Sequence, residues 1–288
     1  MSTLEPATIH AATALGAIRL TVADLDRAQS FYERTIGLTT LDRSNGVARL
    51  GTEAGPLLEL AGEPEAPPRP RGTTGLFHLA LLVPTRADLA TALRRVAESG
   101  WSFTGASDHL VSEALYLYDP EGNGIEIYRD RPRAEWRYVD GNLQMATEPL
   151  DLDGVMGELP AGGSPGPIAA GTRLGHAHLN VADIAAAEAF YGGVLGFDVT
   201  ARGYPGALFL SAGGYHHHVG VNTWAGGDAP PRESRGLRWF EVVLPSTEEL
   251  AAAMNRIEAA GIETEEGEHG IHVRDPSGNG VLLTEAGE

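Results

Sequence analysis

Residues 15–38 read LGAIRLTVADLDRAQSFYERTIGL, and they align without a gap with residues 174–197, LGHAHLNVADIAAAEAFYGGVLGF. Each copy begins with the apolar alternation of a short strand. An aspartate follows that is suited to cap a helix, Asp24 in one copy and Asp183 in the other. The helix carries Phe-Tyr and ends at Ile-Gly or Leu-Gly. The chain therefore contains an internal strand-helix repeat.

A second pair of segments follows the same pattern. Residues 75–100 align with residues 236–261, and each predicts a strand, a turn containing proline and an amphipathic helix. Each leads to a turn of the form Asp-Pro-x-Gly-Asn-Gly, at 119–124 and at 275–280. The apolar residues after this turn predict a closing strand.

The two repeats together predict an α+β fold of four βαβββ units. A first tandem pair occupies 14–130 and a second occupies 173–286. The segment 131–172 connects them, with a short helix expected near 150–159 and a linker rich in Gly, Pro and Ala at 160–171. The four units span 14–62, 74–130, 173–225 and 235–286.

The composition excludes several classes of protein. The 288 residues include 39 acidic and 21 basic side chains, for a net charge of -18, and no run of basic residues suited to nucleic acid. There is no cysteine, hence no disulfide and no thiolate ligand or nucleophile. Neither a signal peptide nor a long apolar span is present, so we expect a cytoplasmic protein without a membrane segment.

The four-unit pattern resembles the vicinal oxygen chelate superfamily, which includes glyoxalase I, fosfomycin-resistance proteins, bleomycin-binding proteins and extradiol dioxygenases. The resemblance covers nearly the whole chain. It implies that the units pair and curl their mixed β-sheets into two cupped barrels with the helices outside. In this family such a cup holds a divalent metal, but it serves several reaction types.

The resemblance also implies where metal ligands lie: a His on the first strand of a unit and a Glu on its last strand. The matching positions hold His176 in the third unit, and His78 and Glu126 in the second. Two His and one carboxylate form the facial ligand set of non-haem Fe(II) oxygenases, and Mn(II) fits the same set. We therefore expect one Fe(II), or alternatively Mn(II), per chain.

The same positions in the first and fourth units hold no complete ligand set. They are occupied by Ala17, Trp239 and Leu282, and Glu59 stands at a carboxylate position without its His. We interpret Glu59 as structural or vestigial. A single site then requires the second unit to pair with the third, either within one chain or between two chains of a homo-oligomer, while the first and fourth units pair with each other.

Residues 107–126, SDHLVSEALYLYDPEGNGIE, resemble the fingerprint of extradiol dioxygenases. The matching positions include His109, Tyr116 and the ligand Glu126. Ser107 departs from the residues usual at its position. The resemblance implies that His109 and Tyr116 orient the oxygens of an aromatic diol and stabilise charge that develops there.

Residues 213–224, GGYHHHVGVNTW, resemble a strand on which these enzymes carry a histidine that is not a metal ligand. We predict His217 as the acid and base of the reaction. Strand alternation places His216 and His218 on the opposite face, so the register of the three is open by one residue. His216, His218 and Trp224 are kept as candidates for the substrate pocket.

These features predict an extradiol dioxygenase that resembles the bacterial catechol 2,3-dioxygenase-like branch and acts in the degradation of aromatic compounds. Its partners are a small aromatic diol and dioxygen. One alternative is a non-redox lyase or transferase of the glyoxalase type, which uses a second carboxylate near the position of Gly220. Another is a metal-free protein that binds a small molecule in the cup.

Overall fold

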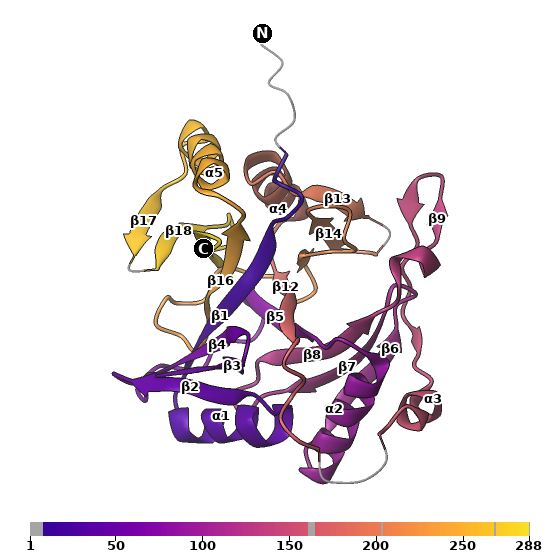
Figure 1. Cartoon of the computed structure of the whole chain (residues 1–288). Helices are drawn as coiled ribbons and strands as arrows, with labels where there is room; N and C mark the ends of the chain where they lie inside the picture. Colours follow the sequence, from indigo (N-terminus) through magenta and orange to yellow (C-terminus); the bar gives the residue numbers. More distant parts are fainter. Residues whose placement is uncertain (1–7, 161–164, 203, 268, 288) are drawn as a thin grey trace.

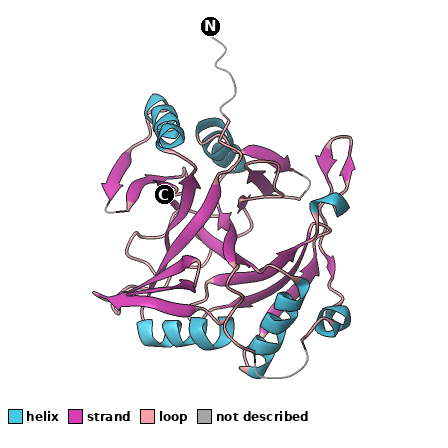
Figure 2. Ribbon diagram, viewed as in Figure 1, coloured by secondary structure: helices cyan, strands magenta, loops and turns pink. Residues whose placement is uncertain are grey.

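The computed structural model describes residues 8–160, 165–202, 204–267 and 269–287, so part of the predicted linker, 161–164, lies outside the described residues. Two mixed β-sheets make up the molecule, and the helices lie on their outer sides (Figures 1 and 2). The α+β fold with two curled sheets is thus confirmed. Within the described residues, each helix is too short or too polar to cross a membrane.

The first sheet has eight strands and combines the first and fourth units. At its centre, β1 pairs antiparallel with β16, which joins the two units. In spatial order the strands are β17 (Thr264–Gly267), β18 (Gly270–Arg274), β19 (Gly280–Glu285), β16 (Gly236–Leu244), β1 (Ala14–Val22), β4 (Gly55–Gly62), β3 (Val47–Thr52) and β2 (Thr39–Ser44).

The second sheet has nine strands and combines the second and third units of the same chain. Its central pair is β5 with β12, again antiparallel, and this is the pairing that a single metal site requires. In spatial order the strands are β11 (Glu148–Pro149), β6 (Phe103–Asp108), β7 (Ser112–Tyr118), β8 (Gly124–Asp130), β5 (Gly75–Leu82), β12 (Arg173–Asn180), β15 (Val219–Asn222), β14 (Ala207–Ser211) and β13 (Asp198–Ala201).

The helices start at side-chain caps. Asp24 and Asp183 accept backbone N–H groups of α1 and α4 as predicted, and Thr85 forms a capping box with Asp88 at α2. The helices are α1 (Leu25–Phe31), α2 (Arg86–Glu98), α3 (Leu152–Gly157), α4 (Ile184–Glu188) and α5 (Thr247–Ala259). Between β8 and β11 lie a 3₁₀ turn, η2 (Arg133–Glu135), and a small hairpin of β9 (Tyr138–Val139) and β10 (Asn142–Leu143).

The helix expected over each Phe-Tyr segment widens into a π-helix, η1 (Tyr32–Ile36) after α1 and η3 (Ala189–Val194) after α4. The tyrosine in each wide turn is fully buried. Tyr32 donates its hydroxyl to Asp119 at 3.0 Å, and Tyr191 donates to Asp275 at 3.0 Å. Each Asp-Pro turn is therefore tied to the helix of the preceding unit, which fixes the start of the following strand, β8 or β19.

Candidate metal centre and pocket

Three buried side chains on the central strands of the nine-stranded sheet meet at one point. His78 projects from β5, Glu126 from β8 and His176 from β12. The Nε2 atoms of His78 and His176 lie 3.2 Å apart, and Glu126 Oε2 lies 3.0 Å from the first and 3.1 Å from the second. The strand pairing thus brings together the three residues that the sequence predicted as metal ligands.

The protonation states suit a cation. Burial raises the pKa of the Glu126 carboxyl, but the His176 and His78 imidazoles outweigh this effect and hold it well below its ordinary value. Burial lowers the pKa of His176 to about 4, against the opposing pull of Glu126. An ionised carboxylate beside a neutral imidazole is the state in which both groups bind a metal.

The size of the triangle also fits a metal ion. Two neighbouring ligand atoms of an octahedral ion lie about 3.0 Å apart when each is about 2.1 Å from the metal. The three observed separations, 3.0, 3.1 and 3.2 Å, match the edges of one octahedral face. Without an ion, two imidazole Nε2 atoms and a carboxylate would compete for one or two protons. The residues present therefore fit a divalent metal.

The position opposite the site on β15 offers no fourth ligand. Gly220 is the register partner of His178, as Glu126 is of Ala80. A Cβ atom on Gly220 would lie only 3.0 Å from the His178 ring, so a larger residue needs that ring to move. The glycine therefore leaves one side of the site without a protein ligand.

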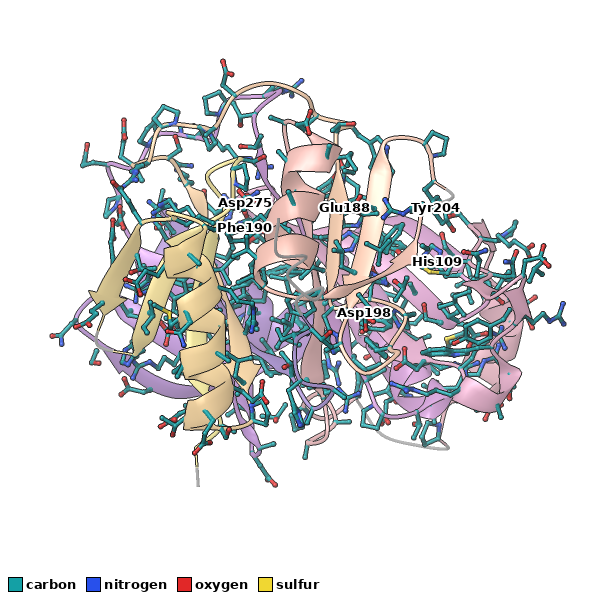
Figure 3. All side chains as sticks on the ribbon, turned by 90° about the horizontal axis from the view of Figure 1, so that it is seen from above. His109, Glu188, Phe190, Asp198, Tyr204 and Asp275 are labelled. Atoms are coloured by element: carbon teal, nitrogen blue, oxygen red, sulfur yellow. The ribbon has the colours of Figure 1, made fainter. Side chains whose placement is uncertain are left out.

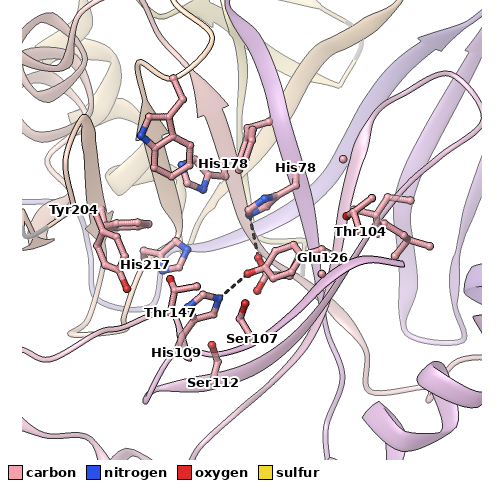
Figure 4. A pocket seen from close by; sticks show the side chains of 18 of the residues that line it. His78, Thr104, Ser107, His109, Ser112, Glu126, Thr147, His178, Tyr204 and His217 are labelled. Carbon is pink, nitrogen blue, oxygen red and sulfur yellow. Dashed lines mark hydrogen bonds and ion pairs between the residues drawn. The ribbon is translucent and has the colours of Figure 1, made fainter. Parts of the chain in front are cut away.

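A pocket of about 410 Å³ opens onto His78 and Glu126. In Figure 4, His78 lies beside Glu126, His217 and Tyr204 lie to their left, and His109 lies below His217. Apart from the site, the walls are mainly aromatic and apolar. They include Phe77, Met145, Tyr204, Phe209 and Trp224.

His109 and Tyr116, both predicted from the fingerprint, lie together at this pocket. His109 Nδ1 lies 2.6 Å from the carbonyl oxygen of Ala146, and its Nε2 lies 2.7 Å from the Tyr116 hydroxyl. A carbonyl only accepts, so Nδ1 carries the proton and, in the neutral ring, Nε2 accepts the tyrosine O–H. The Tyr116 oxygen then keeps its lone pairs for a ligand. Burial raises the pKa of Tyr116, and Glu126 raises it further, so the phenol stays protonated.

His217 lines the pocket, and a chain of hydrogen bonds behind it sets its tautomer. His216 Nε2 lies 2.9 Å from the Asp130 carboxylate, which only accepts, and His216 Nδ1 lies 2.7 Å from His217 Nδ1. A neutral His216 therefore donates to Asp130 and accepts from His217. Among the described residues nothing hydrogen-bonds His217 Nε2, so its lone pair is available to the pocket. Burial lowers the pKa of His217, and neighbouring histidines add to this effect.

The other two histidines of this run do not line the pocket. The segment was expected to be a strand throughout, but β15 begins only at Val219, so the histidines lie in the preceding loop. His216 points back to Asp130, and His218 accepts the backbone N–H of Ala212 at 3.1 Å. Trp224 does line the pocket and is 52% exposed at its mouth.

Sequence analysis missed two residues of the site. His178 lies two positions after His176 on β12, so strand alternation already placed it on the same face. It is buried, lines the pocket and is held by Asn222 at 3.0 Å. No local sequence pattern marks Asp130 as part of the site, because its partner His216 lies 86 positions further along the chain.

Comparisons with known proteins agree with this arrangement. A family model described as the glyoxalase/bleomycin resistance protein/dioxygenase superfamily matches residues 14–127 and 173–283. The catechol-2,3-dioxygenase of Bacillus subtilis (strain 168) is 45% identical over 284 residues, which cover 96% of this chain and 98% of that protein.

Two solved structures share the fold. One, from Bacillus subtilis subsp. subtilis str. 168, is 14% identical, with 97% of this chain and 86% of that chain covered and a TM-score of 0.67. The other, glyoxalase I from Zea mays, is 16% identical, with 94% and 92% covered and a TM-score of 0.57. At these identities the likeness supports the fold alone.

Proposed function

This chain belongs to the glyoxalase/bleomycin resistance protein/dioxygenase superfamily, and from that premise we propose that it is an extradiol dioxygenase that cleaves the ring of a catechol-type substrate with dioxygen at a non-haem Fe(II). The observation that carries the proposal is the triangle of His78, Glu126 and His176 at the wall of an apolar pocket. Mn(II) is the alternative metal, because the same donors accept it.

The proposed ligands are the two imidazoles and the carboxylate of that triangle. A bound Fe(II) would lower the pKa of the diol hydroxyls and supply the redox chemistry with dioxygen. Three ligands on one face leave positions open for the two substrates.

His217 is the proposed acid and base. Its neutral Nε2 faces the pocket, so it accepts a proton from a ring hydroxyl and returns a proton later in the reaction. His216 and Asp130 act behind it as positioning residues, because their hydrogen bonds hold the proton of His217 on Nδ1.

Tyr116 and His109 orient the substrate. The hydroxyl of Tyr116 donates to His109, so the tyrosine oxygen accepts a hydrogen bond from a ring hydroxyl. The pair thereby holds the diol in a fixed orientation at the wall of the pocket.

The lining favours an uncharged ring. Among the described residues, neither Lys nor Arg lines the pocket, whereas Phe77, Phe209 and Trp224 do. A carboxylate on the substrate would be buried without a cation, which is costly. The proposed substrate is therefore a catechol with a neutral substituent or none.

The pocket counts against the glyoxalase-type alternative. Such enzymes tend to take a further carboxylate ligand from the paired unit, and the corresponding register position here is Gly220 under the His178 ring. A metal-free binding protein would have no use for three donors arranged at about 3 Å. Both alternatives are outcomes of the experiment below.

The proposal is tested by anaerobic reconstitution with Fe(II), followed by catechol and air. The expected result is a yellow, ring-opened product in the visible spectrum. The matched control is His78→Ala, which should bind no iron and give no colour. Stoichiometric iron without colour from several neutral catechols would contradict the proposal and favour a non-redox enzyme or a binding protein.

Homo-oligomer formation and a cytoplasmic location stay predictions.

A further inference from the structure

A second cavity, of about 480 Å³, lies between the loop that precedes β16 and the turn that precedes β19. Asp275 belongs to its lining, and in Figure 3 Asp275 lies well apart from His109 and Tyr204, which line the metal-site pocket. The two cavities have no lining residue in common. Five of the lining residues of the second cavity are arginines: Arg69, Arg232, Arg235, Arg238 and Arg274.

This concentration of positive charge is unusual for the chain. The sequence has a net charge of -18 and no lysine, so all 21 basic residues are arginines, and this cavity gathers five of them. Two carboxylates, Asp228 and Asp275, also line it. Asp275 is already saturated by Ser277, Asn279 and Tyr191, and burial raises its pKa, so it neutralises little of this charge.

Two of the arginines are used by the fold. Arg69 Nη1 donates to the carbonyl of Leu76 at 2.8 Å. Arg235 donates to the carbonyl of Ala66 at 2.8 Å and pairs with Glu121 at 2.9 Å. These contacts anchor the walls of the cavity.

The other three guanidinium groups keep most of their donors. Arg238 and Arg274 each donate one bond to a backbone carbonyl, at 2.8 and 2.9 Å. Arg238 also pairs with the half-exposed Glu63 at 3.7 Å, and Arg232 has a loose contact of 3.9 Å with the exposed Glu265. The pKa of Arg274 is lowered by burial, and Arg232 and Arg238 lower it further. Glu265 and Asp275 oppose this lowering only in part, so three like charges lie close together in one wall.

A buried hydroxyl in the same wall also lacks a partner. Ser234 is 2% exposed, lies in the lining, and its Oγ makes no hydrogen bond. A buried hydroxyl without a partner costs free energy, so it favours a polar partner that the described residues do not supply. The unpartnered hydroxyl of Ser234 does not depend on the arginine charges. It is therefore a separate indication that this cavity receives a polar group.

The internal repeat indicates what that group is. In the first half of the chain the Asp-Pro turn carries Glu121, whose carboxylate accepts the N–H groups of Ala23 and Asp24 at 3.3 Å and binds Arg235 at 2.9 Å. In the second half the equivalent residue is Ser277, whose hydroxyl accepts only the N–H of Ala182 at 3.0 Å. The second Asp-Pro turn therefore has a hydroxyl where the first has a carboxylate, and Glu121 of the first turn reaches only one arginine of the cavity, Arg235.

We propose that this cavity is a binding site for an oxyanion group, a phosphate or a carboxylate carried by a small molecule. Arg232, Arg238 and Arg274 bind the anion through their free donors, because the planar guanidinium matches oxyanion geometry. Ser234 adds its hydroxyl as a neutral donor. The site is separate from the metal centre and does not depend on the proposed dioxygenase activity.

Calorimetric titration of the metal-loaded full chain tests the proposal. Sulfate represents a tetrahedral dianion such as phosphate, acetate represents a carboxylate, and chloride at equal ionic strength is the blank. Saturable binding of sulfate or acetate supports the site, and the tighter of the two identifies the kind of oxyanion. Heat no different from the chloride blank for both anions would overturn it.

Two variants locate the binding. Arg232→Ala/Arg274→Ala removes two exposed cations and should weaken binding at least about tenfold, since charge-assisted hydrogen bonds are lost. Ser234→Ala should weaken it by a smaller factor without changing the charge. The charge-matched control is Arg27→Ala/Arg137→Ala, at two exposed positions outside the cavity. Equal weakening in the control and the cavity variant would show non-specific screening and refute the site.

Discussion

The two sheets have the same strand plan, but only one of them has the chemistry of a metal site. In the nine-stranded sheet Glu126 faces Ala80, two positions after His78. In the eight-stranded sheet Glu59 faces Arg19, two positions after Ala17. The carboxylates thus occupy equivalent positions, and the difference lies in their neighbours.

The neighbours of Glu59 make it structural. Its carboxylate pairs with Arg19 at 3.3 Å and with Arg49 at 2.9 Å, where Glu126 meets two imidazoles. Ala17, Trp239 and Leu282 pack together at the positions of the missing ligands. The same fold therefore supports a metal site or a packed cluster, depending on a few side chains at fixed register positions.

The largest expected effect comes from replacing one of two carboxylates, Glu126 or Glu59, by alanine. Glu126→Ala removes one of three proposed ligands and leaves two imidazoles, so the metal should be lost together with all measurable turnover. Glu59→Ala, at the equivalent position of the other sheet, should leave metal binding intact. Metal content after anaerobic reconstitution, measured by mass spectrometry, checks both variants. Normal metal occupancy in Glu126→Ala would mean that the triangle is not the ligand set.

The next effect separates metal binding from proton transfer within the nine-stranded sheet. His217→Phe keeps a ring of similar shape but removes Nε2 from the pocket. Iron should stay bound while kcat falls about 10²- to 10⁴-fold, the usual contribution of an acid or base. Metal analysis and turnover are measured on the same sample. Loss of iron along with activity would identify His217 as a metal ligand and contradict its role as acid and base.

The order of strands and helices could be predicted from the sequence, because each repeat shows the apolar alternation of its strands and the residues of its turns. The resemblance to the vicinal oxygen chelate superfamily then implied His78, Glu126 and His176 as the metal ligands. The orientation of His216, His217 and His218 was not accessible, since they precede β15 in a loop where alternation does not apply. Contacts such as Asp130 with His216 depend on tertiary packing and leave no local pattern.

A third prediction concerns the eight-stranded sheet. Trp239 is 7% exposed and packs with Ala17 and Leu282 where the other sheet has its ligands. Trp239→Ala should lower the free energy of unfolding by about 3 kcal/mol, because large-to-small changes leave a cavity. Metal stoichiometry should not change. Urea unfolding of the metal-loaded protein provides the measurement, and metal loss in the folded variant would show that the two sheets are not independent.

The smallest expected effect is a dependence of stability on pH that is stronger in the half of the chain that carries the metal site. Burial lowers the pKa of His218 to about 3, and its Nδ1 accepts the N–H of Ala212. In the unfolded chain the ordinary value is about 6.5. The unfolded state therefore binds the extra proton first, so this stabilisation is complete above about pH 6.5 and declines as the pH falls toward 3.

Replacing the His218 imidazole tests the direction of this pH dependence of stability. His218→Asn keeps an acceptor for Ala212 but cannot titrate, so between pH 7 and pH 5 the unmodified protein should lose about 2 kcal/mol more unfolding free energy than the variant. Urea unfolding with a chelator present measures this difference. His272→Asn in β18 is the matched control on the other sheet. The pKa of His272 is also lowered by burial, but its side chain is far less enclosed, so its removal should change the slope much less. Equal slopes for both variants would show that His218 is not a source of the acid sensitivity.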